Sequence, residues 1–130
     1  MKQVTAAVLM HAGRLLICQR PPSDHLAGLW ELPGGKVESN ETPEACLERE
    51  LREELGIGSA VGPCFGTSEY VYPGGAIALV AYHVTWTKGE IVASFHSDAR
   101  FVDREELGRY RFAPADTPLI EKLREQWPRG

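Results

Sequence analysis

Short apolar runs separated by turn-forming residues open the chain. Residues 4–10 and 15–18 are apolar and partly β-branched, and residues 11–14 between them are typical of a hairpin connection. A loop with two prolines follows over residues 20–29, and residues 30–32 could form a brief strand that ends at a proline and two glycines. The pattern predicts two paired strands, a loop and a short third strand.

The spacing of apolar positions then changes from that of a strand to that of a helix. Leu47, Leu51 and Leu55 recur every four residues, which places them on one face and leaves charged residues on the others. Thr42 can cap the start of this helix and Gly56 its end. We therefore expect an amphipathic helix of about 14 residues.

The second half of the chain returns to strand patterns and closes with helical spacing. Strand character covers residues 64–72, 77–86, 91–93 and 100–102, with glycine-containing turns between several of these runs. Apolar residues at helical spacing cover residues 118–127. These patterns predict a mixed β-sheet and a C-terminal helix that can cover one of its faces, and therefore an α/β fold.

Length and composition narrow the classes of protein that fit. A chain of 130 residues with 43% hydrophobic residues is expected to form a single domain over residues 1–130. Its net charge of -4 argues against stable binding to nucleic acid or to an anionic membrane. A negatively charged ligand would need the help of a metal ion. The sequence favours neither a monomer nor a homodimer.

Cysteine content and the N-terminus both point to the cytoplasm. Cys18, Cys46 and Cys64 are odd in number and lack C-x-x-C spacing, so neither a disulfide framework nor a zinc cluster is indicated. The apolar run at residues 4–10 has no signal-peptide cleavage site and is far shorter than the ~20 apolar residues of a membrane span. We expect a cytoplasmic protein.

Three carboxylates share one face of the predicted helix. Glu50, Glu53 and Glu54 stand at i, i+3 and i+4, where like charges repel one another. A bound Mg²⁺ would offset this repulsion, because it prefers carboxylate oxygens and often shares its shell with phosphates. By themselves, three such residues are more typical of a solvated surface partnered by Arg49 and Arg52.

The surrounding residues change this balance. Gly35 is followed after five residues by Glu41, and after seven more by the run Arg49-Glu50-Leu51-Arg52-Glu53-Glu54-Leu55-Gly56-Ile57. Residues 35–57 resemble the Nudix box in every specified position. Residues 28–38, the pair Gln19-Arg20 and residues 112–116 are also similar to the MutT-type branch of that family. The resemblance implies the Nudix fold, an α/β/α sandwich with a mixed β-sheet.

The same resemblance implies a reaction. MutT-type members hydrolyse (deoxy)nucleoside triphosphates, among them oxidised or modified ones, to a nucleoside monophosphate and pyrophosphate, and thereby cleanse the nucleotide pool that DNA synthesis and repair draw on. Two alternatives stay open: a Nudix hydrolase of ADP-ribose, a dinucleotide or capped RNA, and a non-catalytic Nudix module that binds a nucleotide. The box is intact, which favours an enzyme.

Residue roles in the reaction also follow from the resemblance. It implies that Glu50, Glu53, Glu54 and the carbonyl of Gly34 hold Mg²⁺; Mn²⁺ suits the same ligands. Either Glu53 or Glu50 would deprotonate the attacking water. Arg49 would orient the first of these glutamates, since its planar guanidinium suits a bidentate contact with a carboxylate.

Two further residues near the box have alternative interpretations. Glu41 matches a family position that supports the metal site, although an acid near a helix N-terminus is favourable in any case. Lys36 could contact a phosphate of the substrate or remain in solvent. A MutT-type chain commonly carries another glutamate in the loop before its last strand, and that position falls on Phe95. Neighbouring His96 is expected in the core or on the surface, and Asp98 could replace the glutamate.

The sequence determines the base of the substrate less sharply than it determines the reaction. Arg20 and His25 match the spacing of base-contacting residues in members that act on 8-oxo-dGTP, and Tyr72 could stack on a base or pack at the rim. Asp116 stands where those members place asparagine. An ionised aspartate accepts from an amino group such as N4 of cytosine, which resembles the branch acting on CTP and 5-methyl-dCTP. A buried aspartate can instead be protonated and donate to an oxidised purine.

Overall fold

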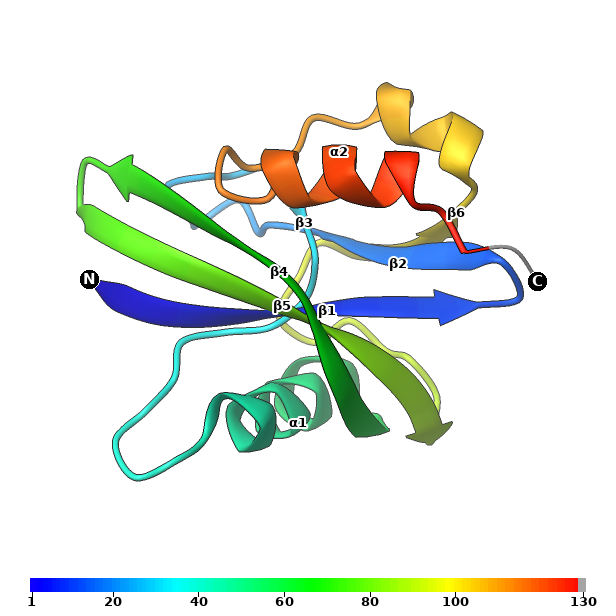
Figure 1. Ribbon diagram of the computed structural model, residues 1–130, viewed down its shortest axis with the longest axis horizontal. Helices are drawn as coiled ribbons and strands as arrows, with labels where there is room; N and C mark the ends of the chain where they lie inside the picture. Colours follow the sequence, from blue (N-terminus) through cyan, green and yellow to red (C-terminus); the bar gives the residue numbers. More distant parts are fainter. Residues whose placement is uncertain (129–130) are drawn as a thin grey trace.

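A computed structural model describes residues 1–128 as a sheet flanked by helices (Figure 1). The strands are β1 (Lys2–His11), β2 (Arg14–Gln19), β3 (Trp30–Glu31), β4 (Gly58–Tyr72), β5 (Gly75–Lys88) and β6 (Asp98–Val102). The helices are α1 (Pro43–Leu55), the short 3-10 helix η1 (Arg104–Arg109) and α2 (Thr117–Glu125). Helix α1 covers one face of the sheet, and α2 covers the other. The expected α/β/α sandwich is confirmed.

The sheet is mixed, as predicted, because β1 runs parallel to β5 and the remaining strand pairs are antiparallel. The strand order is β3-β2-β1-β5-β4, with β6 paired to β2. Strand β1 is central and buried on both faces: Ala6 and Val8 belong to the core under α2, and Ala7 and Leu9 belong to the core under α1. This two-sided burial explains its nearly continuous apolar sequence.

Helix α1 has the ends that the sequence predicts. The hydroxyl of Thr42 accepts a hydrogen bond from the backbone N–H of Ala45 at 3.1 Å, and Gly56 ends the helix in a left-handed conformation with φ of 74°. Leu47 and Leu51 are buried against the sheet together with Leu55. The opposite, charged faces of α1 are left for other contacts.

The neighbouring strands β1 and β2 separate soon after their hairpin turn, and another segment takes the place of β2. The two strands pair only at residues 10–11 and 14–15. Farther along β1, the N–H of Thr5 donates to the carbonyl of Gly35 and that of Ala7 to the carbonyl of Pro33, both at 2.8 Å. The glycine pair of the box is thereby held against the central strand.

Some element boundaries differ from the predictions. Residues 91–93 are not a strand, because the N–H of Val92 donates to the carbonyl of Leu55 and ties this segment to the end of α1. Strand β4 begins at Gly58 and not at residue 64, and it passes through register shifts that an apolar pattern does not reveal. Helix α2 ends at Glu125, and η1 was not predicted. Within residues 1–128, no helix is long and apolar enough to cross a membrane.

Candidate active site

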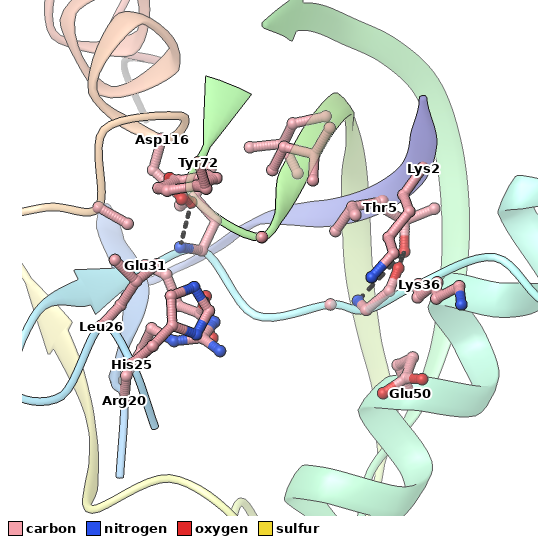
Figure 2. Close-up of a pocket in the computed structure, with 18 of the residues that line it drawn as sticks. Lys2, Thr5, Arg20, His25, Leu26, Glu31, Lys36, Glu50, Tyr72 and Asp116 are labelled. Atoms are coloured by element: carbon pink, nitrogen blue, oxygen red, sulfur yellow. Dashed lines mark hydrogen bonds and ion pairs between the residues drawn. The ribbon is translucent and has the colours of Figure 1, made fainter. Parts of the chain in front are cut away.

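A pocket of about 400 Å³ opens where β1, the loop before β3, the glycine pair and α1 meet. Most of the residues that the sequence marked as candidates for binding or catalysis line it: Arg20, His25, Gly34, Lys36, Glu50, Glu54, Tyr72 and Asp116. Figure 2 shows two ends to this pocket. We call them the α2 end, around Asp116, Tyr72 and Arg20, and the α1 end, around Lys36 and Glu50.

Asp116 is the most deeply buried acid of the α2 end. It is 5% exposed, and one of its carboxylate oxygens accepts a hydrogen bond from the N–H of Leu32 at 3.0 Å. Burial, and secondarily the charge of Glu31, raises the pKa of Asp116 well above its usual value. The carboxyl group is therefore poised to accept from a ligand N–H or, when protonated, to donate to a ligand carbonyl. Both sequence-based interpretations remain compatible with its position.

Arg20 lies between two carboxylates at the same end. It forms a bidentate contact with Asp24, and its remaining terminal nitrogen donates to Glu31 at 2.6 Å. The contact with Arg20 lowers the pKa of Asp24 to about 2. The second oxygen of Glu31 pairs with Nε2 of the buried His96 at 2.8 Å. Arg20 is thus a fixed part of the pocket wall.

Aromatic rings complete the α2 end. The Tyr72 hydroxyl accepts a hydrogen bond from the N–H of Ala115 at 2.9 Å, which fixes the ring beside the pocket. The exposed ring of His25 lies edge-on to Tyr72, with the ring centroids 6.1 Å apart. Tyr72 therefore packs at the rim and also presents a surface to the pocket. The two predicted roles of this tyrosine are not exclusive.

Arg49 organises the charges behind the α1 end. It donates to Glu41 at 2.8 and 3.0 Å, to Glu50 at 2.9 Å and to Glu53 at 3.0 Å. Arg49 and Glu53 do not line the pocket itself, and the Glu53 side chain is 52% exposed. Glu41 does not cap α1, since Thr42 does so; its contact with Arg49 lowers the pKa of Glu41 to about 2. Glu41 therefore holds the arginine.

The two remaining carboxylates of the helix face are partly buried in the pocket. Burial, followed by the charges of Glu50 and Glu31, raises the pKa of Glu54 to about 8. Burial also raises the pKa of Glu50. Within residues 1–128, no three histidine, cysteine or acidic side chains already surround a metal position. The Glu53 carboxylate instead accepts a hydrogen bond from Arg49 at 3.0 Å.

The donor set nevertheless fits a divalent cation that prefers oxygen ligands. A Cβ atom on Gly35 would lie 2.3 Å from the carboxylate carbon of Glu50, so only glycine lets the backbone approach this carboxylate. The carbonyls of Pro33 and Gly35 bond to β1, and the carbonyl of Gly34 between them is consequently directed away from β1. Burial and, after it, repulsion from neighbouring carboxylates raise the pKa of Glu54, and a positive charge here would offset both effects.

Several lining residues were not predicted from the sequence. Glu31 lies in a segment that resembles the MutT branch, yet nothing in its spacing indicates that it joins Arg20 to His96. Phe95 lines the pocket and is 46% exposed, whereas His96 is in the core. Asp98 pairs with Arg100 at 2.7 Å and does not line the pocket, so it does not stand in for a glutamate there.

Both the sequence and the fold of this chain match known proteins. The profile of a family described as "NUDIX domain" matches residues 4–122. The chain is 42% identical over 121 residues to a CTP pyrophosphohydrolase of Escherichia coli K12, an alignment that covers 93% of this chain and 90% of that protein. It is 44% identical over 77 residues to an 8-oxo-dGTP diphosphatase of Proteus vulgaris, covering 59% of this chain and 69% of that protein.

A solved structure agrees with these sequence matches. The solution structure of the E. coli ORF135 protein superposes on this chain with a TM-score of 0.85 at 41% sequence identity. The superposition covers 100% of this chain and 95% of the other. The similarity therefore extends over the whole fold, including the segments that form both ends of the pocket.

Proposed function

Because this chain belongs to the Nudix family of hydrolases, we propose that it hydrolyses (deoxy)nucleoside triphosphates to a nucleoside monophosphate and pyrophosphate. The observation that carries the proposal is one continuous pocket with two chemically different ends. Asp116 and Tyr72 offer a hydrogen-bonding group and an aromatic surface at the α2 end, and Glu50 and Glu54 offer carboxylates at the α1 end. A nucleotide has the same polarity: a base at one end and phosphates at the other.

The α2 end supports a base that bears an exocyclic amino group. An ionised Asp116 accepts from such a group, and cytosine and 5-methylcytosine both carry one. The similarity to a CTP pyrophosphohydrolase agrees with this substrate class. A protonated Asp116 would instead donate to a base carbonyl, as in 8-oxo-dGTP. We therefore propose both classes as substrates and place the activity in the cleansing of a cytoplasmic nucleotide pool.

The α1 end supports hydrolysis of the phosphate chain. Water attacks the β-phosphorus, the bond from this phosphorus to the oxygen bridging the α-phosphate breaks, and nucleoside monophosphate and pyrophosphate leave. We propose that Glu50, Glu53, Glu54 and the Gly34 carbonyl hold Mg²⁺, for which Mn²⁺ can substitute. When bound, such an ion neutralises charge on the phosphate oxygens.

The protein's own groups position the water and the phosphates. Arg49 holds Glu50 and Glu53 in place, and one of these two carboxylates accepts the proton of the attacking water. Glu41 keeps Arg49 in its orientation through two hydrogen bonds. Lys36 lines the same end and offers its ammonium group to the phosphate chain.

The proposal is tested by identifying products. Purified protein, a Glu53→Gln variant and a Glu48→Gln control are incubated with Mg²⁺ and CTP, dCTP, 5-methyl-dCTP, 8-oxo-dGTP, dGTP, ADP-ribose and a dinucleotide. Glu48 is exposed on the same helix and does not line the pocket. We expect monophosphate and pyrophosphate from a triphosphate, an activity at least ~100-fold lower for Glu53→Gln, and no change for Glu48→Gln.

Other outcomes separate the alternatives. Cleavage of only ADP-ribose or the dinucleotide would move the chain to another branch of the family. Absence of turnover with every compound, together with measurable nucleotide binding, would favour the non-catalytic module. Equal loss in Glu53→Gln and Glu48→Gln would show that the carboxylates of α1 act through the stability of the helix and not through chemistry.

A further inference from the structure

A half-exposed phenylalanine stands in the wall of the pocket. Phe95 is 46% exposed, and it lines the cavity together with Glu54 and Arg20. A single exposed apolar ring is common on protein surfaces, but this one lies in the wall of a ligand-sized cavity, where a ligand can cover it. The proposed phosphate chemistry makes no use of this ring.

The segment that carries Phe95 is anchored on both sides. Before it, the hydroxyl of Ser94 donates to the carbonyls of Glu53 at 3.2 Å and Glu54 at 3.0 Å, at the end of α1. After it, the N–H of Ser97 donates to the carbonyl of Gln19 in β2 at 3.0 Å. Phe95 is therefore held at a defined position between α1 and the sheet.

His96 supports the ring directly. Its side chain is fully buried, and its Nε2 lies 2.8 Å from a carboxylate oxygen of Glu31. Because an ionised carboxylate only accepts, Nε2 is the donor in this pair. The rings of Phe95 and His96 meet edge to face, with centroids 5.1 Å apart at 82°. Within residues 1–128, Nδ1 of His96 has no hydrogen-bond partner, so the contact with Glu31 is the bond that orients the imidazole.

We propose that Phe95 is the wall against which the nucleoside part of the substrate packs, and that His96 is the positioning residue that keeps it there. The proposal rests on the proposed function, since that function supplies the nucleotide. An uncharged ring has no favourable charge to offer a phosphate chain, but it stacks on a base or covers the apolar face of a sugar. The apolar side chains Leu26, Ile77 and Leu79 also line this cavity, so a nucleoside meets other apolar walls besides Phe95.

Binding measurements separate the nucleoside from the phosphates. Wild-type protein and the variants Phe95→Ala, Phe95→Leu and Phe95→Tyr are titrated by calorimetry, in Mg²⁺, with CMP, dCMP, GMP and inorganic tripolyphosphate. For the monophosphate that binds best, we expect Phe95→Ala to raise Kd about tenfold, Phe95→Leu to raise it less, and Phe95→Tyr to change it within about twofold. The Kd of tripolyphosphate should stay within about twofold in all three.

A matched control lies in the same segment. Val92 is 62% exposed, apolar and outside the pocket lining, so Val92→Ala should leave both affinities unchanged. An unchanged Kd of the monophosphate in Phe95→Ala overturns the proposal, as does an equal loss of monophosphate and tripolyphosphate binding. If wild-type protein binds no monophosphate and cleaves no triphosphate, the proposed function itself fails. Turnover without an effect of Phe95 overturns only this inference.

The role of His96 is tested by measuring how its substitution changes KM and kcat separately. His96→Gln keeps a side-chain N–H donor for Glu31, and His96→Ala removes it. We expect His96→Ala to raise KM about five- to tenfold with kcat within about threefold, and His96→Gln to stay close to wild type. In the double variant Phe95→Ala/His96→Ala, KM should rise no further than in Phe95→Ala, because both act through one contact. Additive effects, or a fall in kcat alone, would refute the positioning role.

Discussion

The polar groups of the α2 end include the buried Asp116 and, behind them, the buried His96, whereas the carboxylates around the α1 end include the half-exposed Glu53. At the α2 end, Glu31 connects Arg20 to His96, and Asp116 bonds to the backbone of Leu32. Asp116 and His96 are buried, and Arg20 and Glu31 are mostly buried, so this wall has little freedom to rearrange. This rigidity suits an end that selects a ligand by shape and by hydrogen bonds.

The α1 end is arranged differently. Glu50, Glu53 and Glu54 come from one helix, and Arg49 joins Glu50 and Glu53 to Glu41, which precedes that helix. Glu53 is half-exposed and pairs with Arg49 at 3.0 Å. Such an arrangement suits charged ligands that arrive and leave with each turnover. The two ends therefore supply different groups to a ligand, and four substitutions test this difference.

The largest effect is expected from removing the shared cation. Arg49→Ala takes away the hydrogen-bond donor of Glu41, Glu50 and Glu53, so the last two lose their orientation while α1 keeps its buried leucines. We expect kcat to fall about 100- to 1,000-fold with a change in the free energy of unfolding near 1 kcal/mol. Steady-state kinetics and urea unfolding measure both. Arg52→Ala, on an exposed position of the same helix, serves as the control and should retain activity.

A smaller effect is expected from adding one methyl group to the glycine pair. Gly35→Ala places a Cβ 2.3 Å from the Glu50 carboxylate carbon, which must move, and we expect kcat to fall about 10- to 100-fold. Gly34→Ala instead meets the backbone of Thr5 at 2.0 Å and should chiefly lower stability. Gly74, also in the pocket lining, has open space around it. Normal activity in Gly35→Ala, with Gly74→Ala as the control, would contradict the close approach.

The third test concerns the buried acid of the α2 end. Because the pKa of Asp116 is raised on folding, the folded state retains a proton that the unfolded state releases above its ordinary pKa of 3.8. The contribution of Asp116 to stability is therefore fully present below that pKa and is lost as pH rises towards the raised value. We expect Asp116→Asn to be more stable than wild type at pH 8, and this advantage to shrink as pH falls.

Denaturant unfolding at several pH values measures this linkage. The same variant should also differ in base preference. We expect the kcat/KM for CTP, divided by the kcat/KM for 8-oxo-dGTP, to change about tenfold, because asparagine always offers an N–H that an ionised aspartate lacks. An unchanged ratio would show that Asp116 does not read the base. A stability difference independent of pH would show that its carboxyl is not the titrating group.

The smallest effect is expected from Asp24. Its pKa is lowered to about 2 by Arg20, so its stabilising contribution is present above the ordinary pKa of 3.8 and is lost as pH falls towards 2. Asp24→Asn should lower the free energy of unfolding at pH 7 by about 1 kcal/mol, after allowance for solvent screening, and by progressively less below pH 4. Urea unfolding at pH 7, 4 and 2.5 measures this. A loss that persists at pH 2.5 would point to packing and not to charge.

The two ends also differ in how far the sequence predicted them. The α1 end comes from residues 35–57, where local rules apply: the cap at Thr42, the stripe of leucines and the left-handed Gly56 all follow from short-range chemistry. The α2 end depends on pairs such as Glu31 with His96, which are 65 residues apart, and Leu32 with Asp116, which are 84 apart. No local periodicity marks such partners.

By itself, the sequence determined the helix, its caps, the carboxylates on one face, the glycines beside them and the family resemblance that assigns their chemistry. These features depend on side-chain spacing and backbone preference within a few residues, so they can be read without a fold. Only the tertiary structure decided that Arg20 is held by Asp24 and Glu31, that Asp116 is buried, and that Phe95 faces the pocket. Burial and long-range pairing arise when distant segments pack together, and packing is a property of the whole chain.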